Sequence, residues 1–109
     1  GTTRVFRVTG SGTSASATYL GTPSGMRAYD NALSIDAHNM MAASSNFTDN
    51  NVTIWDLANP AQPTVLWQIE KKWAHHVALR SPGPGATPVL SIVSGAGINS
   101  AEVFSKVGT

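Results

Sequence analysis

The regular alternation of short apolar blocks and turn-forming residues most constrains the fold of this chain. Blocks of valine, isoleucine, leucine and aromatic residues are separated by stretches rich in Gly, Pro, Asn and Ser. Such blocks predict β-strands, and helical periodicity is almost absent. We therefore expect an all-β protein with strands at residues 4–8, 17–21, 32–36, 40–44, 52–57, 64–69, 76–80, 89–93 and 102–107.

The sequence also resembles itself at an offset of 49 residues. The Val-Phe pair at 5–6 aligns with the Ile-Trp pair at 54–55 (54 − 5 = 49), which aligns in turn with the Val-Phe pair at 103–104. The same offset places Leu20 on Ile69. A repeat of about 49 residues and four strands has the size of a β-propeller blade. We expect residues 1–109 to form one all-β unit or segment, with repeats at about 4–52 and 53–101 and the start of a third.

Residues 51–80 resemble the β-propeller repeats named for their LVIVP and YVTN sequences. Those repeats carry the pattern DxxNPxxPxxV between the third and fourth strands of a blade, and segment 75–77 resembles the start of the next innermost strand. The resemblance implies β-propeller-type four-stranded blades, about two of them in this chain. The aspartate should end a strand and bond nearby backbone N–H groups, while the prolines stiffen the turn. Asp56, Asn59, Pro60 and Pro63 fill the pattern here, and Val65 lies one residue before the position of its valine.

Two blades do not close a ring. Propellers typically contain four to eight blades, and an incomplete ring exposes apolar faces and strand edges. We therefore expect either further copies of the chain, in a homo-oligomer, or the remainder of a larger propeller chain to complete the structure. A β-sandwich is the alternative fold, because nine strands also suffice for two packed sheets.

Composition excludes several function classes. Seven basic and six acidic residues give a net charge of +1, without a patch that could neutralise a row of phosphates, so nucleic acid is not an expected partner. No apolar run approaches the roughly 20 residues of a membrane span. The absence of cysteine excludes disulfides and thiolate chemistry. Abundant Ser, Thr, Gly and Asn favour an extracellular or cell-surface location, and Asn46 and Asn51 begin N-glycosylation sequons whose use the sequence leaves open.

The candidate ligand-binding residues are His38, Trp73, His75 and His76. In a propeller these residues could gather at one rim. Histidines can bind metals or move protons, but neighbours in a regular strand point to opposite faces, so His75 and His76 should not bind one ion together. Trp73 is the strongest candidate, for example as a platform on which a sugar stacks. Trp55 and Trp67 are predicted to pack in the core.

No catalytic constellation is recognisable. Asp30, Asp36 and Glu70 lack the spacing of an acid/base pair, and GxSxG, GxGxxG and P-loop motifs are absent. We assign no catalytic residue and expect no metal and no cofactor. Three functions stay open. The first is a non-enzymatic binding or scaffold module whose rim loops recognise a carbohydrate or protein partner. The others are a fragment of a propeller enzyme with a central His/acid or metal site, and a β-sandwich structural or assembly protein of the coat or adhesion type.

Overall fold

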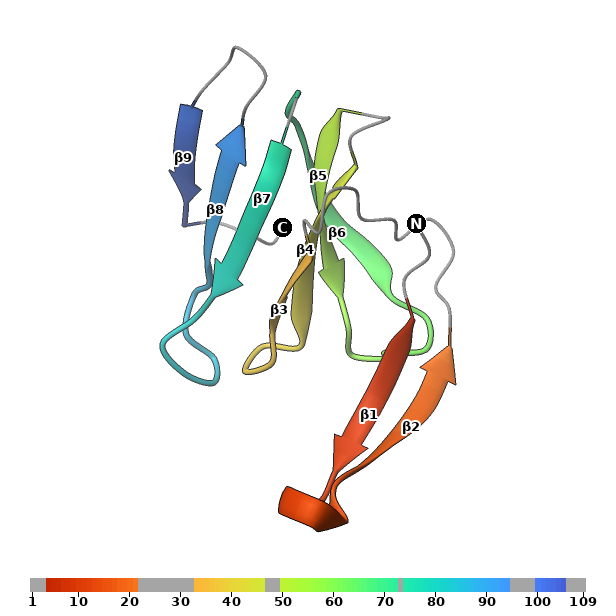
Figure 1. The fold of residues 1–109 in the computed structure, drawn as a ribbon. Helices are drawn as coiled ribbons and strands as arrows, with labels where there is room; N and C mark the ends of the chain where they lie inside the picture. The colour runs from red at the N-terminus through yellow and green to blue at the C-terminus, as the bar shows by residue number, and fades with distance from the viewer. Residues whose placement is uncertain (1–3, 22–32, 47–49, 73, 95–99, 106–109) are drawn as a thin grey trace.

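The structure, a computed structural model, describes residues 4–21, 33–46, 50–72, 74–94 and 100–105 (Figure 1). These residues form β-strands and one short 3-10 turn, η1 (Gly12–Ser14), which confirms the predicted all-β class. Each predicted strand overlaps an observed one. The strands are β1 (Val5–Thr9), β2 (Ser16–Gly21), β3 (Leu33–Asp36), β4 (Met41–Asn46), β5 (Asn51–Asp56), β6 (Thr64–Glu70), β7 (Ala74–Arg80), β8 (Val89–Ser94) and β9 (Ser100–Phe104).

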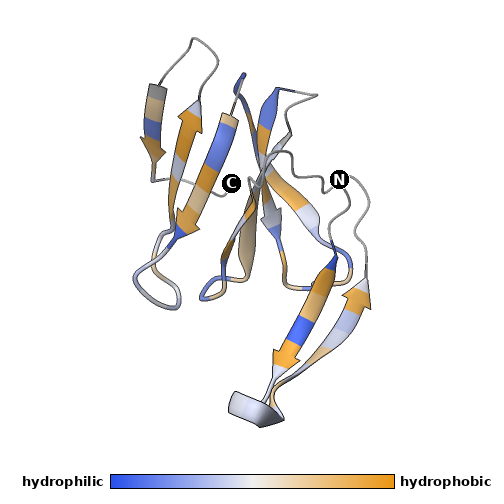
Figure 2. Ribbon diagram, viewed as in Figure 1, coloured by the Kyte–Doolittle hydropathy of each residue, from blue (hydrophilic) through white to orange (hydrophobic). Residues whose placement is uncertain are grey.

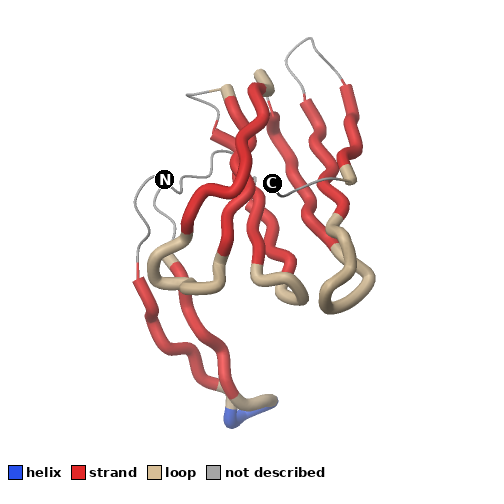
Figure 3. Tube along the Cα trace, turned by 180° about the vertical axis from the view of Figure 1, so that it is seen from behind, coloured by secondary structure: helices blue, strands red, loops and turns tan. Residues whose placement is uncertain are grey.

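The strands form three antiparallel sheets in which each strand pairs with the next one along the chain. The sheets have the orders β1-β2, β3-β4-β5-β6 and β7-β8-β9. The loops that follow β3, β5 and β7 lie at the same end of the molecule (Figures 1 and 3). Among the described residues, no helix is long and apolar enough to cross a membrane.

Aspartates end two strands of the central sheet and begin their turns. Asp36 Oδ1 accepts a hydrogen bond from the His38 backbone N–H at 3.0 Å, and Asp56 Oδ1 accepts one from the Ala58 N–H at 2.8 Å. A carboxylate that bonds the N–H two residues ahead replaces the next ladder hydrogen bond and turns the chain. This geometry confirms the expectation that Asp56 ends a strand and bonds nearby backbone N–H groups.

The two middle strands of the central sheet, β4 and β5, are buried on both faces. One face shares a hydrophobic core with the β7–β9 sheet, and β7 lies against β3 and β4. On the opposite face, Trp55 is buried with Ala42 and Leu57, and its indole N–H donates to Ser44 Oγ at 2.9 Å. The prediction that Trp55 packs in the core is confirmed. The shared core consists of Ala43, Val52, Ile54, Ala74, Leu79, Leu90 and Ile92.

The same irregularity interrupts two hairpins. In β1–β2 the register shifts between Val5 and Phe6, which leaves Leu20 as the extra residue of β2. In β5–β6 the register shifts between residues 54 and 55, and Leu66 is the extra residue of β6. The first members of the two shifts are 49 residues apart, as in the sequence alignment. The pairing, however, matches Leu20 with Leu66 and not with Ile69, because only nine residues separate the paired Trp55 and Val65, against twelve between the paired Phe6 and Tyr19.

Candidate functional site

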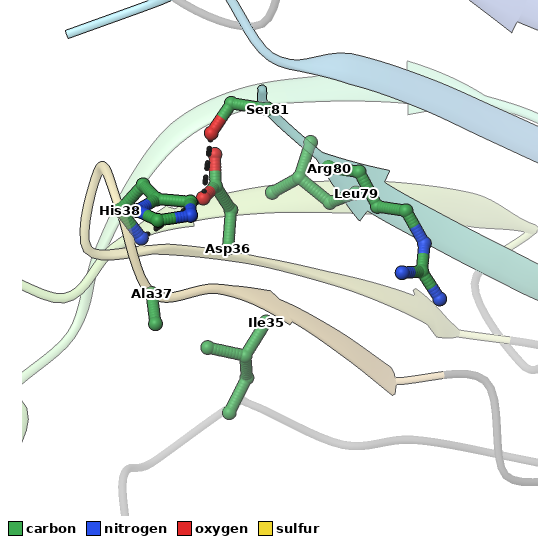
Figure 4. A pocket seen from close by; sticks show the side chains of 7 residues that line it. All are labelled: Ile35, Asp36, Ala37, His38, Leu79, Arg80 and Ser81. Carbon is green, nitrogen blue, oxygen red and sulfur yellow. Dashed lines mark hydrogen bonds between the residues drawn. The ribbon is translucent and has the colours of Figure 1, made fainter. Parts of the chain in front are cut away.

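A pocket of about 290 Å³ lies where β3 and β7 end (Figure 4). The two strands lie side by side and run in the same direction: the Leu79 backbone N–H donates to Ser34 Oγ at 2.9 Å, and Ser81 Oγ donates to Asp36 Oδ1 at 2.9 Å. Both cross-links join residues 45 positions apart. The pocket is lined by Ile35, Asp36, Ala37, His38, Leu79, Arg80 and Ser81.

The carboxylate of Asp36 is held by hydrogen bonds from its own turn and from the neighbouring sheet. Oδ1 accepts from the His38 N–H and from the Ser81 hydroxyl, and Oδ2 accepts from the Asn39 side-chain amide at 3.0 Å. The residue is only 3% exposed. A buried carboxylate needs such donors, because an unpaired buried charge is very costly. Asp36 therefore fixes the shape of this end of the sheet.

Asn39 joins the β3–β4 turn to the loop that follows β7. Its Nδ2 also donates to the Ala86 carbonyl at 2.9 Å, and its Oδ1 accepts from the Gly85 N–H at 3.0 Å. Gly85 has φ of 75°, a conformation that glycine adopts without strain. The Gly- and Pro-rich segment at residues 81–88 is thus tied to the neighbouring sheet beside the pocket.

The ionisation of Asp36 follows from these contacts. Burial by itself raises the pKa of the carboxyl, but hydrogen bonds from the Asn39 and Ser81 side chains and from the backbone of His38 and Asn39 outweigh it, and the pKa lies below its ordinary value. Asp36 is therefore ionised at neutral pH. Its lone pairs are directed at protein donors, so it is poorly placed to accept a proton from a substrate.

The structure does not bring the predicted site residues together. His38 is exposed at the pocket, just after β3, whereas His75 and His76 lie at the start of β7. Because β3 and β7 run in the same direction, the two groups lie at opposite ends of the strands, and β7 alone spans about 20 Å. The expectation that His38 gathers with these residues at one rim is therefore not met. Trp73 lies outside the described residues, and its ligand contact stays a prediction.

A β-bulge changes the geometry of the histidine pair. Ala74 pairs with Ser94 and His76 with Val93, so His75 is an extra residue in β7. In a regular strand His75 and His76 would point to opposite faces. A bulge interrupts this alternation of side chains. His75 is half-buried and His76 is exposed. Within the described part of the chain, no group of three or more His, Cys, Asp or Glu side chains is placed to hold a metal ion.

Sequence reasoning missed Ile35, Arg80 and Ser81 as pocket residues. The sequence signal that could have found them is their position at strand ends. Arg80 is the last residue of β7, as Asp36 is the last residue of β3, and Ser81 follows β7 directly. Neither position carries a motif. Comparison of the chain with protein-family models, with curated proteins and with solved structures finds no match. The interpretation of the pocket therefore depends on its geometry.

Proposed function

We propose that this chain is a non-enzymatic binding module, a β-propeller segment whose pocket between the ends of β3 and β7 recognises a carbohydrate. The observation that carries the proposal is an open pocket with a fixed frame. Beside it, Asp36 and Asn39 join the β3–β4 turn to the segment after β7 through three hydrogen bonds, to Ser81, Gly85 and Ala86. Two further hydrogen bonds, from the His38 N–H to Asp36 and from the Asn39 amide to Asp36, hold the turn itself. A frame that is already rigid loses little conformational entropy when a ligand binds.

Three features support the propeller arrangement. The sheets are meanders, and the first strands of successive sheets, β3 and β7, lie side by side in the same direction. The first strands of propeller blades surround the central channel in this way. The register shift that recurs after 49 residues supports a structural repeat. On this proposal further sheets complete the ring, and an extracellular or cell-surface location suits the proposed ligand.

The chemistry of the pocket favours a sugar over a reacting substrate. Ile35, which is 59% exposed, offers an apolar surface, and His38 and Arg80 offer hydrogen-bonding groups at the margin. Sugars combine apolar ring faces with a rim of hydroxyls, and pockets with an apolar wall and a few polar groups suit such ligands. The one buried carboxylate of the pocket is engaged by protein donors. A loop of a protein partner is the alternative occupant.

The test is a screen of neutral and acidic glycans against the 109-residue chain, followed by NMR titration with the strongest binder. We expect amide shifts around residues 35–38 and 79–81. Arg80→Ala should weaken binding by roughly ten- to a hundredfold, because a hydrogen bond from a charged donor contributes about 1.5–3 kcal/mol. Arg4→Ala, which removes an exposed arginine outside the pocket, is the matched control. Shifts confined to residues 74–76, with loss of binding in His76→Ala alone, would overturn the pocket assignment, as would the absence of any glycan binder.

A second candidate function is a β-sandwich structural or assembly protein. It is favoured by one observation, the hydrophobic core that the four-stranded and three-stranded sheets share. The third candidate, a propeller enzyme fragment, requires a central metal or a His/acid site. Metal analysis of the purified protein tests the enzyme, because stoichiometric bound metal would favour it over the binding module.

A further inference from the structure

One face of the β7–β9 sheet has no cover among the described residues. The cross-strand pairs place Ala78, Ser91 and Val103 next to one another on this face, and their neighbours Leu79, Leu90 and Phe104 on the other face, toward the core. Val103 is 71% exposed. Val89 and Val93, which alternate with Leu90 and Ile92, are also exposed. The face therefore has a centre of small and β-branched side chains, with the exposed side chains of His76 and Arg80 beside it on β7.

The corresponding face of the central sheet is covered along its middle strands, β4 and β5. Ile54 and Val103 are 49 residues apart in equivalent strands, and their cross-strand partners are Ala43 and Ser91. Ala43 and Ile54 are 0% exposed, because the β7–β9 sheet packs on them. Within one molecule, the same type of face is thus buried beneath a neighbouring sheet in one case and open in the other.

The opposite end of the molecule presents a complementary face. Phe6 and Val8, on one face of β1, are exposed, and the Phe6 ring lies 5.5 Å from that of its cross-strand neighbour Tyr19. Phe6 precedes Phe104 by twice the repeat offset. In the internal interface Phe104 reaches back toward the central sheet, with its ring 6.2 Å from that of Trp67. Phe6 is therefore the counterpart of Phe104, the residue through which the β7–β9 sheet packs on the preceding sheet.

We propose that a second copy of the chain covers this face: the β1–β2 hairpin of one copy packs on the outer face of the β7–β9 sheet of the next. The large rings of the hairpin would meet the small side chains Ala78, Ser91 and Val103, as large side chains of β7–β9 meet Ala43 inside the molecule. The two faces lie at opposite ends of the row of sheets (Figures 1 and 3), and Figure 2 shows the apolar residues of β1 and β8.

This contact joins two different faces, so it is head-to-tail and closes into a ring if the rotation between copies allows it. With three sheets in each copy, two copies would supply six sheets, within the four to eight blades that propellers typically contain. The inference names the partner in the proposed ring and does not depend on what the pocket binds. A monomer that binds a glycan would contradict only the contact between copies, and an oligomer that binds no glycan would contradict only the proposed function.

The chain contains no cysteine, so single introduced thiols report the contact cleanly. Val8→Cys and Val103→Cys are prepared separately, then mixed and treated with a short bis-maleimide. We expect a covalent dimer in the mixture and little product from either variant alone. Val65→Cys, at a position that is 50% exposed on β6, is the control and should cross-link to neither. Native mass spectrometry of the unmodified chain should give a multiple of 11.4 kDa.

Two results would overturn the proposal. The first is a single species of 11.4 kDa at the highest soluble concentration, which would leave a longer chain or another protein as the occupant. The second is efficient cross-linking of Val103→Cys with itself, which would indicate a symmetric contact. Phe6→Ser provides a further check, because its side chain lies outside the core clusters. It should weaken assembly at least tenfold while the circular dichroism spectrum is unchanged.

Discussion

The central sheet and the N-terminal hairpin use the same strand pairing in opposite environments. In both, a register shift follows the first apolar residue of the pair, at Val5 in the hairpin and at Ile54 in the central sheet. The strand around Ile54 is buried on both faces, whereas β1 is mostly exposed. Local sequence therefore sets the pairing, and neighbouring sheets decide how much each residue contributes to stability.

The largest expected effect comes from truncating the two equivalent residues. Ile54→Ala should lower the free energy of unfolding by about 2–4 kcal/mol, because it leaves a cavity in the shared core. Val5→Ala should cost less than about 1 kcal/mol, since its site is only half-buried. Urea denaturation measures both. The extra methylene of isoleucine accounts for only about 0.8 kcal/mol of the difference, so equal costs would contradict the contrast between the regions.

The two strand-ending aspartates allow a second comparison. Asp36→Asn should cost about 2 kcal/mol at neutral pH, because it replaces one acceptor oxygen with an amide NH2 group that faces existing donors. The wild-type protein should lose this contribution as the pH falls below about 4, since a carboxyl with a lowered pKa in the folded state stabilises it only while ionised. The difference between variant and wild type should therefore shrink in acid.

Asp56→Asn is the matched control for this prediction. Its carboxylate accepts one hydrogen bond, from Ala58, in a turn that does not contact another sheet through it. The cost should stay below about 1 kcal/mol. Unfolding curves recorded across the acidic range measure both variants, and a difference for Asp36→Asn that stays constant down to low pH would show that the charge of Asp36 does not stabilise the fold.

The sequence predicts strands well because their signals are local. All nine strands follow from apolar blocks and turn residues, and the Asp56 turn follows from one side chain and the N–H two residues later. The pocket was not predictable in this way, since Asp36 and Ser81 meet only through the packing of two sheets. The expected grouping of His38 with His75 and His76 missed the orientation of β3 and β7, which only the tertiary structure gives.

The adjacent serines Ser44 and Ser45 of β4 are both buried, but only the hydroxyl of Ser44 forms a hydrogen bond to another described residue. Ser44 Oγ accepts the Trp55 indole N–H, so Ser44→Ala leaves that donor buried and unpaired and should cost about 1–3 kcal/mol. Ser45 Oγ is buried without a hydrogen-bond partner in the described structure. Ser45→Ala should therefore be neutral or slightly stabilising. Thermal unfolding measures both, and equal destabilisation by the two changes would contradict the assigned contacts.

The smallest effect is expected at the turns that flank β4. Met40 and Asn50 share a left-handed backbone conformation, with φ of 50° and 52°. Asparagine tolerates this conformation, whereas methionine pays a steric cost of about 1 kcal/mol. Met40→Asn should therefore stabilise the protein by a few tenths to about 1 kcal/mol. The packing lost with the half-exposed methionine side chain reduces this gain. The reverse change, Asn50→Met, should destabilise by a similar amount. Thermal unfolding of the two variants tests the pair, and shifts of the same sign would show that backbone strain does not distinguish these turns.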